Sequence, residues 1–359
     1  MAQNSQNNLG EKRKETAYVK CDSCGANLSF DPKTQELKCF HCGSYKSFEK
    51  SNAVSELFIE NAFIEAENID KSSSVYRCDN CGAVVVLSAH EVATFCPYCN
   101  TSHIVKSDDL SGLKPNAVYP YTVVKEDAVS QAKTWAKKKI FAPSSFKKSL
   151  NVEQIHGIYE PAFTFDSTTY STYYGRVGKR HTRVVGSGKN RRTQTYIIWR
   201  TISGSFNRVF DDVFINASGD YEQKTFDKIL PFNYAEIKTY TQEYLSGFMA
   251  KHHDKDINTA WGEAKGAMDR ILKREILSQY FYDVVDYINV DTTHEKVTYK
   301  YVLLPVYQLN FRYKKKNYSV FVNGETAKVT GKTPVSPLRV LTAIGIGLAV
   351  IGLLALLII

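Results

Sequence analysis

The stretches CDSCGANLSFDPKTQELKCFHCG at residues 21–43 and CDNCGAVVVLSAHEVATFCPYCN at residues 78–100 are two copies of one pattern. Each copy holds two CxxC pairs spaced by 18 positions, and the copies are offset by 57 positions. A CxxC turn presents two thiolates from one tight bend, and two such turns surround a zinc ion tetrahedrally. The sequence therefore predicts an internal duplication that forms two zinc ribbons, at 17–46 and 75–106.

All eight cysteines of the chain lie in these pairs, so none is left over for a disulfide bond or a catalytic thiol. Disulfides are typical of secreted chains, and a redox-active CxxC normally occurs as a single motif. Rubredoxin-like iron uses the same four thiolates and remains the alternative metal. A closed four-thiolate site leaves no position for water, so its metal is expected to stabilise the fold. The predicted cofactor is zinc, two ions per chain, bound by Cys21, Cys24, Cys39, Cys42, Cys78, Cys81, Cys96 and Cys99.

The C-terminal stretch, residues 338–359, is LRVLTAIGIGLAVIGLLALLII, and it is uncharged from Val340 onward. Twenty helical residues rise about 30 Å, the thickness of the hydrocarbon core of a bilayer. The N-terminal residues are polar and lack the apolar region of a signal peptide. Because Lys332 and Arg339 precede the apolar run, the positive-inside rule puts the rest of the chain in the cytoplasm. The sequence predicts a single-pass protein of the cell membrane with a cytoplasmic soluble part.

Residues 113–335 have the pattern of a globular domain. Their strand-like stretches, 157–175, 193–218 and 296–331, are rich in Tyr, Val, Ile and Thr. Apolar residues at helical spacing predict helices over 126–140 and within 234–282, and Asn323-Gly324 is typical of a two-residue hairpin turn. We expect an α+β fold with mostly antiparallel strands. The complete plan is a disordered segment at 1–16, zinc ribbon 1 at 17–46, a linker with a short helix at 47–74, zinc ribbon 2 at 75–106, the α+β domain at 113–335 and a transmembrane helix at 338–359.

One segment of the chain is strongly basic. The formal net charge is +9, and residues 176–192 hold seven Arg or Lys and no acid, with a Gly-Ser-Gly tip. This pattern predicts a protruding hairpin that binds nucleic-acid phosphates, anionic headgroups or an acidic protein. A solvated basic loop is the alternative. A membrane tether would favour lipid or an acidic partner. The residues concerned are Arg176, Lys179, Arg180, Arg183, Lys189, Arg191 and Arg192.

Motifs for catalysis are missing from the sequence. An ATP-driven motor needs GxxxxGK[ST], but Thr326 stands where the first Gly of a motif ending in Gly331-Lys332-Thr333 would be. The His/Asp cluster at 252–256 falls between two predicted helices, where a solvated loop is expected and Asp256 is a natural N-cap. We therefore predict that the chain is not an enzyme and has no catalytic residue.

The order of motifs along the chain carries a resemblance. After the cysteine repeats come NAVYPYTVVKEDAVSQAKTWAKKKIFAPSSF from residue 116, IHGIYEPAFTFD from residue 155, YLSGF from residue 244, LLPVYQLNFRYKKKNYSVFVNGETAKVTGKTPVS from residue 303 and the apolar end. This order is similar to a family of bacterial membrane proteins, common in Gram-positive genomes, called TFIIB-type zinc-ribbon-containing and sometimes primosomal helicase-like. Asn100 departs from the Gly that usually ends a zinc knuckle. The resemblance implies partners of the phage-shock type in an envelope-stress response.

Taken together, these patterns predict a membrane-anchored, zinc-binding, non-enzymatic interaction scaffold on the cytoplasmic face. Its expected partners are the membrane and other proteins, with envelope stress as the setting that the resemblance implies. The alternative function is a membrane-tethered nucleic-acid-binding protein, which the zinc ribbons and the basic segment permit.

Overall fold

The computed structural model describes residues 14–17, 19–66, 74–77, 84–87, 91–95, 102–105, 113–150, 155–219 and 222–358. For some of these residues the structure describes the backbone but not the side chain. They are residues 14–17, 64–66, 149, 189, 353–358 and the described residues within 74–105.

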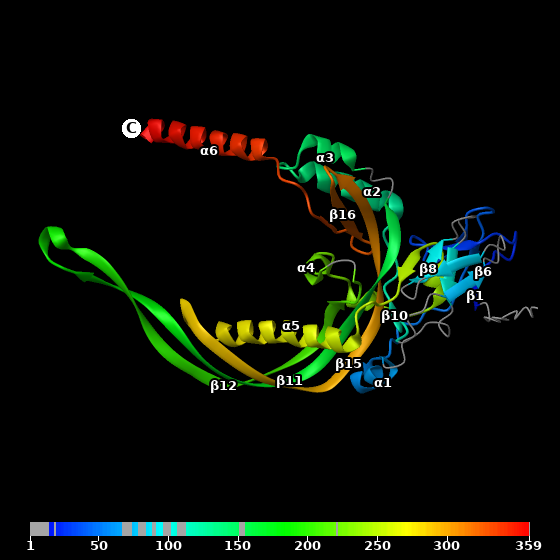
Figure 1. Cartoon of the computed structure of the whole chain (residues 1–359), viewed down its shortest axis with the longest axis horizontal. Coiled ribbons are helices and arrows are strands. Elements are labelled where there is room, and N and C mark those ends of the chain that lie inside the picture. The colour runs from blue at the N-terminus through cyan, green and yellow to red at the C-terminus, as the bar shows by residue number, and fades with distance from the viewer. Residues whose placement is uncertain are drawn as a thin grey trace, which may run out of the picture.

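Three very long strands form the body of the structure: β11 (His156–Val185), β12 (Arg192–Asn216) and β15 (Val284–Tyr313). β11 lies in the middle and pairs antiparallel with β12 on one side and β15 on the other. Figure 1 shows them as a bent sheet whose β11–β12 end projects far from the rest. The pairing has register shifts next to Phe165 and Arg176, and such β-bulges increase the local twist of a sheet.

The two halves of the sheet differ in how they are covered. From Ile158 to Ser167 every residue of β11 is buried, as is β15 from Tyr299 to Tyr307, because other elements cover both faces there. Further out, exposed and buried residues alternate along β11, which is the pattern of a sheet with one solvated face. Helix α5 (Ile257–Ser278) lies on the other face through residues at helical spacing: Ile257, Ala260, Ala264, Met268, Leu272 and Ile276.

Shorter elements surround the long strands. Along the sheet, β10 (Ala117–Val118) and β14 (Met249–Lys251) extend the pairing to β15 and β11. The others are β1 (Lys14–Ala17), β5 (Leu57–Phe58), β6 (Ser74–Arg77), β7 (Val84–Leu87), β8 (Glu91–Phe95), β9 (Ser102–Val105), β13 (Lys238–Thr239), β16 (Lys316–Asn323) and β17 (Val329–Gly331), with helices α1 (Ile59–Ala66), α2 (Lys125–Lys138), α3 (Ser144–Ser149) and α4 (Gln223–Phe226). A separate small sheet contains β2 (Leu28–Asp31), β3 (Glu36–Cys39) and β4 (Tyr45–Lys46).

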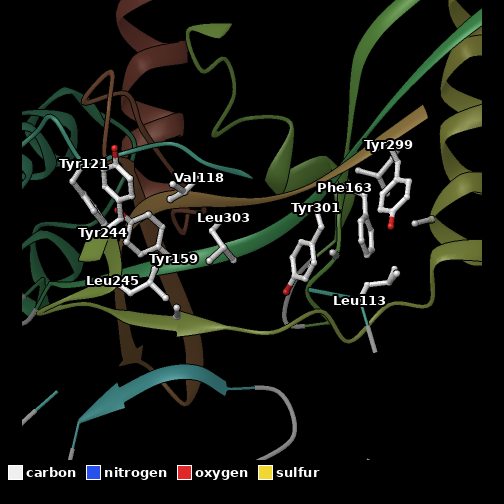
Figure 2. Close-up of a cluster of buried hydrophobic side chains, with 14 of the residues drawn as sticks. Leu113, Val118, Tyr121, Tyr159, Phe163, Tyr244, Leu245, Tyr299, Tyr301 and Leu303 are labelled. Atoms are coloured by element: carbon white, nitrogen blue, oxygen red, sulfur yellow. The ribbon is translucent and has the colours of Figure 1, made fainter. Parts of the chain in front are cut away.

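Buried tyrosines dominate the core, as Figure 2 shows. The ring of Tyr121 stacks on Phe248 with centroids 4.1 Å apart. Its hydroxyl donates to the carbonyl oxygens of Ile158 and Val306, at 3.0 and 2.9 Å. These bonds join α2's leading loop to β11 and β15, since a buried phenol needs such partners. The aromatic residues that are frequent in the sequence thus fill the core in the covered half of the sheet.

The predicted α+β layout with a transmembrane helix is wrong. The structure is mostly antiparallel β-sheet, with 42 % strand and 27 % helix. Helix α5 lies along the long strands, whereas α6 extends away from the sheet (Figure 1). Strands of the predicted second ribbon also join the main sheet, because β8 pairs with β14.

Helix α6 (Pro337–Ile358) covers the predicted membrane segment. Its first turn is held by Arg339, whose guanidinium donates to the carbonyl oxygens of Ile140 and Ala142 at 2.8 and 2.7 Å. Among the described residues, however, no helix combines the length and the apolar character that crossing a membrane requires. The predictions of a transmembrane helix at 338–359 and of a single-pass cell-membrane protein with a cytoplasmic soluble part are therefore wrong.

The Asn323-Gly324 pair also departs from its prediction. β16 and β17 do form a hairpin, but residues 324–328 separate them, which is longer than a two-residue turn. Asn323 is fully buried, and its amide donates to the carbonyl oxygens of Ile229 and Pro231. A Cβ on Gly324 would come within 2.5 Å of the Tyr121 ring. Tertiary packing, rather than turn conformation, therefore requires glycine here.

Candidate metal centre and basic hairpin

Four cysteines meet at one end of the small β2–β3–β4 sheet. Cys21 and Cys24 precede β2, Cys39 ends β3, and Cys42 follows it. Their four sulfur atoms lie within 4.8 Å of one another, and the pairs Cys21–Cys42 and Cys24–Cys39 are each 3.5 Å apart. Sulfurs bound tetrahedrally at about 2.3 Å from a zinc ion are about 3.8 Å apart, so the set fits. This four-cysteine group can hold a metal ion.

The backbone around the cysteines is shaped for this role. Gly25 and Gly43, just after the two CxxC pairs, have φ angles of +71° and +78°, which other residues rarely adopt. The N–H of Gly25 donates to the carbonyl oxygen of Cys21, and the N–H of Gly43 to that of Cys39. Each CxxC therefore forms a closed turn that turns its thiols toward the other pair.

The thiols differ in how readily they ionise. A hydrogen bond from the Ser44 hydroxyl at 3.0 Å lowers the pKa of Cys21 to about 6, with help from backbone N–H groups and against the effect of burial. A backbone hydrogen bond from Ala26 lowers the pKa of Cys24, but burial and the neighbouring thiols outweigh it and raise this pKa to about 12. Four negative charges at this spacing repel one another, so a bound cation is what allows all four thiolates to form.

The small sheet is fixed to the main one by Phe30 and its neighbours. Phe30 packs edge-on against Tyr244 and Phe48, with ring centroids 5.4 and 6.2 Å apart. Its N–H donates to the carbonyl oxygen of Ser246 at 2.9 Å. At Gly247, where φ is +85°, an added Cβ would lie 2.8 Å from the side chain of Ser29. The YLSGF motif at 244–248 is therefore the surface on which the four-cysteine unit packs.

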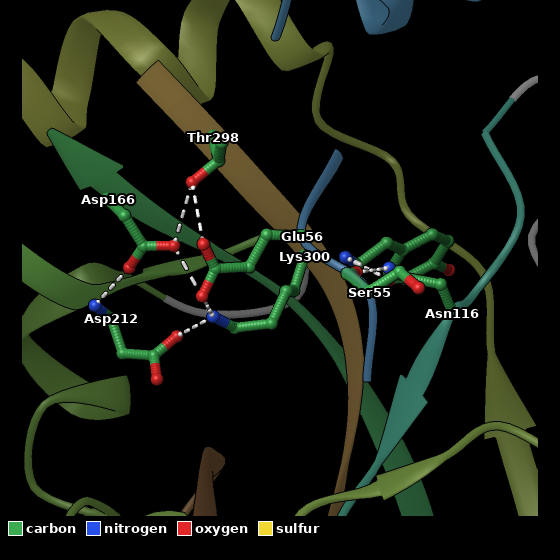
Figure 3. A network of polar contacts seen from close by, with 8 residues as sticks. Ser55, Glu56, Asn116, Asp166, Asp212, Thr298 and Lys300 are labelled. Atoms are coloured by element: carbon green, nitrogen blue, oxygen red, sulfur yellow. Dashed lines mark hydrogen bonds and ion pairs between the residues drawn. The ribbon is translucent and has the colours of Figure 1, made fainter. Parts of the chain in front are cut away.

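The remaining four cysteines, Cys78, Cys81, Cys96 and Cys99, lie outside the described residues. The second zinc ion stays a prediction. A second group with metal-ligand chemistry, Glu56, Asp166 and Asp211, does occur in the described part of the chain. The ammonium of Lys300 lies among these carboxylates, 3.1 Å from Glu56 and 3.3 Å from Asp166 (Figure 3). This lysine supplies the positive charge, so the group is best understood as a buried ionic cluster.

The histidines of the 252–256 cluster are buried, contrary to the predicted solvated loop. His252 is 3 % exposed and His253 is 6 % exposed. Nδ1 of His252 lies 2.9 Å from the hydroxyl of Tyr301, and the N–H of His253 donates to the same hydroxyl. The two histidines are buried because they pack against Tyr301 and Phe163 in the covered half of the sheet, whereas Asp254 and Asp256 are exposed. Asp256 does cap α5, accepting from the N–H of Thr259 at 3.1 Å.

The predicted basic residues all lie on the β11–β12 hairpin. β15 pairs with β11 only as far as Gly178, so residues 179–198 form a two-stranded extension, which we call the hairpin arm. Its tip contains a short 3₁₀ turn (Gly188–Asn190), and Gly186 there has a φ of +91°. Figure 1 shows the arm projecting away from the rest of the structure. The arm contains Lys179, Arg180, Arg183, Lys189, Arg191 and Arg192 and no Asp or Glu.

The cations of the arm are distributed over both of its faces. Opposite residues of paired strands share a face, and the register pairs Arg183 with Gln194 and Arg180 with Ile197. Lys179, Arg183 and Arg192 therefore lie on one face, and Arg180 on the other. The side chain of Lys189 is outside the described residues.

Aromatic rings lie among these cations. The guanidinium of Arg176 lies 5.1 Å from the centre of the Trp199 ring, and Arg183 lies 5.7 Å from that of Tyr196. Arg176 also pairs with Asp286 at 3.6 Å. Sequence reasoning alone misses these aromatic residues, although Tyr196 and Trp199 between Arg192 and Arg200 in a strand-like segment are a visible signal. Rings that hold guanidinium groups over a solvated sheet are suited to binding planar, anionic ligands.

Comparison with known proteins gives little about function. No protein-family model matches the chain, so the TFIIB-type resemblance stays a prediction. The chain is 29 % identical over 234 residues to a Bacillus subtilis (strain 168) protein described as uncharacterized protein YdjG, covering 65 % of this chain and 67 % of that protein. No solved structure matches.

Proposed function

We propose that this protein binds nucleic acid through the hairpin arm, residues 179–198. The observation that carries the proposal is a two-stranded arm with six cations and no acid, projecting from the sheet. Arg and Lys that contact phosphates release condensed counterions, which supplies most non-specific affinity for nucleic acid. A two-stranded β-ribbon also has the width that the major groove of B-form DNA admits. Charge and shape therefore agree on one class of partner.

The predicted preference for lipid over nucleic acid depended on a membrane anchor. That anchor is corrected above, so the preference loses its support. A non-enzymatic interaction scaffold with protein partners of the phage-shock type stays a prediction. Among the described residues, no feature favours this role over nucleic-acid binding.

The test compares two charge reversals of equal size. In the full chain, Arg180→Glu/Arg183→Glu/Arg192→Glu removes cations from the arm. Lys314→Glu/Lys315→Glu/Lys316→Glu makes the same change of charge at the β15–β16 turn, outside the arm. Binding of fluorescent DNA and RNA oligonucleotides is measured by anisotropy at several salt concentrations.

The arm variant should lose most of its affinity, and on duplex DNA its plot of log K against log salt should be shallower by about 2.7, which is about 0.9 per lost phosphate contact. The control variant should keep its affinity within a few-fold. Failure of the unmodified protein to bind any oligonucleotide at low salt would overturn the proposal. So would an equal loss in the two variants.

We further propose that zinc fills the Cys21–Cys42 site and that a second zinc is held by Cys78, Cys81, Cys96 and Cys99. A set of four thiolates selects zinc or iron over harder cations. Metal analysis of the reduced full chain should then give two zinc per chain, and Cys39→Ser/Cys42→Ser should leave one. One zinc or fewer in the unmodified protein would disprove the paired-site assignment.

A further inference from the structure

The outer half of the sheet has a solvated face opposite the one on which α5 lies (Figure 1). On this face, four successive rows of residues cross β12, β11 and β15, and every one of the twelve side chains is exposed. We call this array the outer face. Its rows are Asn207–Tyr170–Thr293, Ser205–Thr172–Asp291, Ser203–Tyr174–Asn289 and Thr201–Arg176–Tyr287.

The chemistry of the outer face is unusual for a solvated sheet. It consists of hydroxyl and amide side chains with three tyrosines, one Arg and one Asp, and it contains no Val, Ile, Leu, Met or Phe. Tyr170, Tyr174 and Tyr287 are 46, 52 and 36 % exposed, so their rings are open to a ligand. Tyr174 and Tyr287 are neighbours, with ring centroids 5.8 Å apart. Rings surrounded by short polar side chains offer flat apolar surfaces with hydrogen-bonding groups beside them.

The outer face continues directly into the hairpin arm. The next rows along the same face pair Gly178 with Trp199 and Arg180 with Ile197. The Arg176 guanidinium, at the junction, lies over the Trp199 ring. Of the arm's cations, Arg180 shares this face, whereas Lys179, Arg183 and Arg192 lie on the opposite one. A ligand that runs along the outer face therefore passes from Arg180 and Arg176 to the exposed rings. Asp291 is the one acid within the array.

We propose that the outer face is a stacking platform for single-stranded nucleic acid, with bases on Tyr170, Tyr174 and Tyr287 and phosphates on Arg176 and Arg180. This proposal rests on the proposed function and specifies its substrate. Bases in a duplex are stacked on each other, whereas those of a single strand can stack on aromatic side chains. An exposed sheet face that combines such rings with cations is the usual surface for single strands. A duplex would use the arm alone.

The test removes rings while keeping strand propensity. Tyr174→Thr/Tyr287→Thr introduces a residue that already occurs on the outer face. Tyr45→Thr/Tyr234→Thr is the matched control, because these tyrosines are 48 and 54 % exposed but lie elsewhere. Dissociation constants for a 20-nucleotide oligo(dT) and for a 20-base-pair duplex are measured at one salt concentration, with urea midpoints to confirm that each variant is folded.

The Tyr174→Thr/Tyr287→Thr variant should bind oligo(dT) at least about 25-fold more weakly, since each lost stacking contact lowers affinity roughly 5-fold or more. Its duplex affinity and the control variant should change by less than about 2-fold. Tyr174→Phe/Tyr287→Phe keeps the rings and should bind oligo(dT) like the unmodified protein.

Two results would overturn the platform while leaving the proposed function intact. One is an unchanged oligo(dT) affinity in the Thr variant when charge reversal of the arm abolishes binding. The other is tyrosine-dependent retention on an amylose column without tyrosine-dependent binding of oligo(dT), which would make the outer face a glycan surface. If the unmodified protein binds neither oligo(dT) nor duplex at low salt, both proposals fail together.

Discussion

Replacing Lys300 by Met tests whether the buried ionic cluster stabilises the sheet through charge. The Lys300 side chain is 6 % exposed, and its ammonium lies 2.9 Å from Asp212, 3.1 Å from Glu56 and 3.3 Å from Asp166 (Figure 3). Burial by itself would lower the pKa of Lys300, but the hydrogen bond and charge of Asp212 and the charge of Asp166 outweigh it and raise the pKa. A lysine with a raised pKa stabilises the folded state fully at pH values below the ordinary pKa of 10.5. This stabilisation is lost only as the pH rises through the pKa of the folded state. The contribution is therefore complete at pH 7.

Removing this cation should cost about 3 kcal/mol of unfolding free energy at pH 7. Breaking a buried ion pair costs about 3–5 kcal/mol because the partner is left charged and poorly solvated. The lower end applies here, since Glu56 is 48 % exposed and can turn to water. Asp166 also keeps two hydrogen bonds, from the N–H of Asp212 at 2.5 Å and from the hydroxyl of Thr298 at 3.1 Å. Met preserves most of the buried volume, so cavity formation adds little.

Urea unfolding followed by tryptophan fluorescence at pH 7 and pH 4 measures the effect. The loss should be smaller at pH 4, because burial and the charges of Asp212 and Asp166 raise the pKa of Asp211, so the cluster carries less negative charge there. Lys273→Met, at an exposed i,i+4 pair with Asp269, is the control and should cost less than about 0.5 kcal/mol. Adding Asp212→Asn to Lys300→Met should recover part of the loss, and Asn tolerates the φ of +50° at that position. A cost under about 1 kcal/mol at pH 7, or an equal cost at both pH values, would refute the charge explanation.

Three further outcomes are expected. Phe30→Ala should lower the unfolding free energy by about 3 to 5 kcal/mol because it removes a buried ring. The zinc content should stay unchanged, and a loss of zinc would contradict the view that Phe30 packs the small sheet while the four cysteines bind the metal. Burial and the charge of Lys265 lower the pKa of His294, so stability should fall as pH drops below the ordinary 6.5, and His294→Phe should flatten that dependence in urea titrations. Gly186→Ala should destabilise the tip of the arm by about 1 kcal/mol or more, seen as faster proteolysis there, because φ is +91° and the new Cβ would lie 2.3 Å from the Asn190 oxygen; unchanged proteolysis would argue against a strained tip.

Features set by a few neighbouring residues could be predicted from the sequence. The spacing of Cys21, Cys24, Cys39 and Cys42 is local, and the two bends need only one hairpin to bring the thiols together. Asp256 caps α5 for the same reason, since its partner N–H is three residues away. Local geometry leaves little freedom for tertiary structure to override.

Features set by distant contacts could not be predicted. Asn323-Gly324 has the sequence of a tight turn, yet its conformation is decided by Tyr121 and by the carbonyl oxygens of Ile229 and Pro231, which no local pattern reveals. The 30-residue lengths of β11 and β15 are equally non-local, because the strands pair with each other as far as Gly178 and β11 continues to Val185 only by pairing with β12. The sequence signal marks where strands can form, and pairing decides where they stop.

The placement of the cations on the arm bears on which anion they fit. A flat layer of lipid headgroups can touch one face of a two-stranded ribbon at a time. Lys179, Arg183 and Arg192 lie on one face of the arm and Arg180 on the other, so a flat surface would leave part of the charge unused. A nucleic-acid groove, or a strand that wraps the arm, presents phosphates on both sides of it. Without a tether that fixes the arm beside headgroups, charge on two faces of a narrow projection favours nucleic acid.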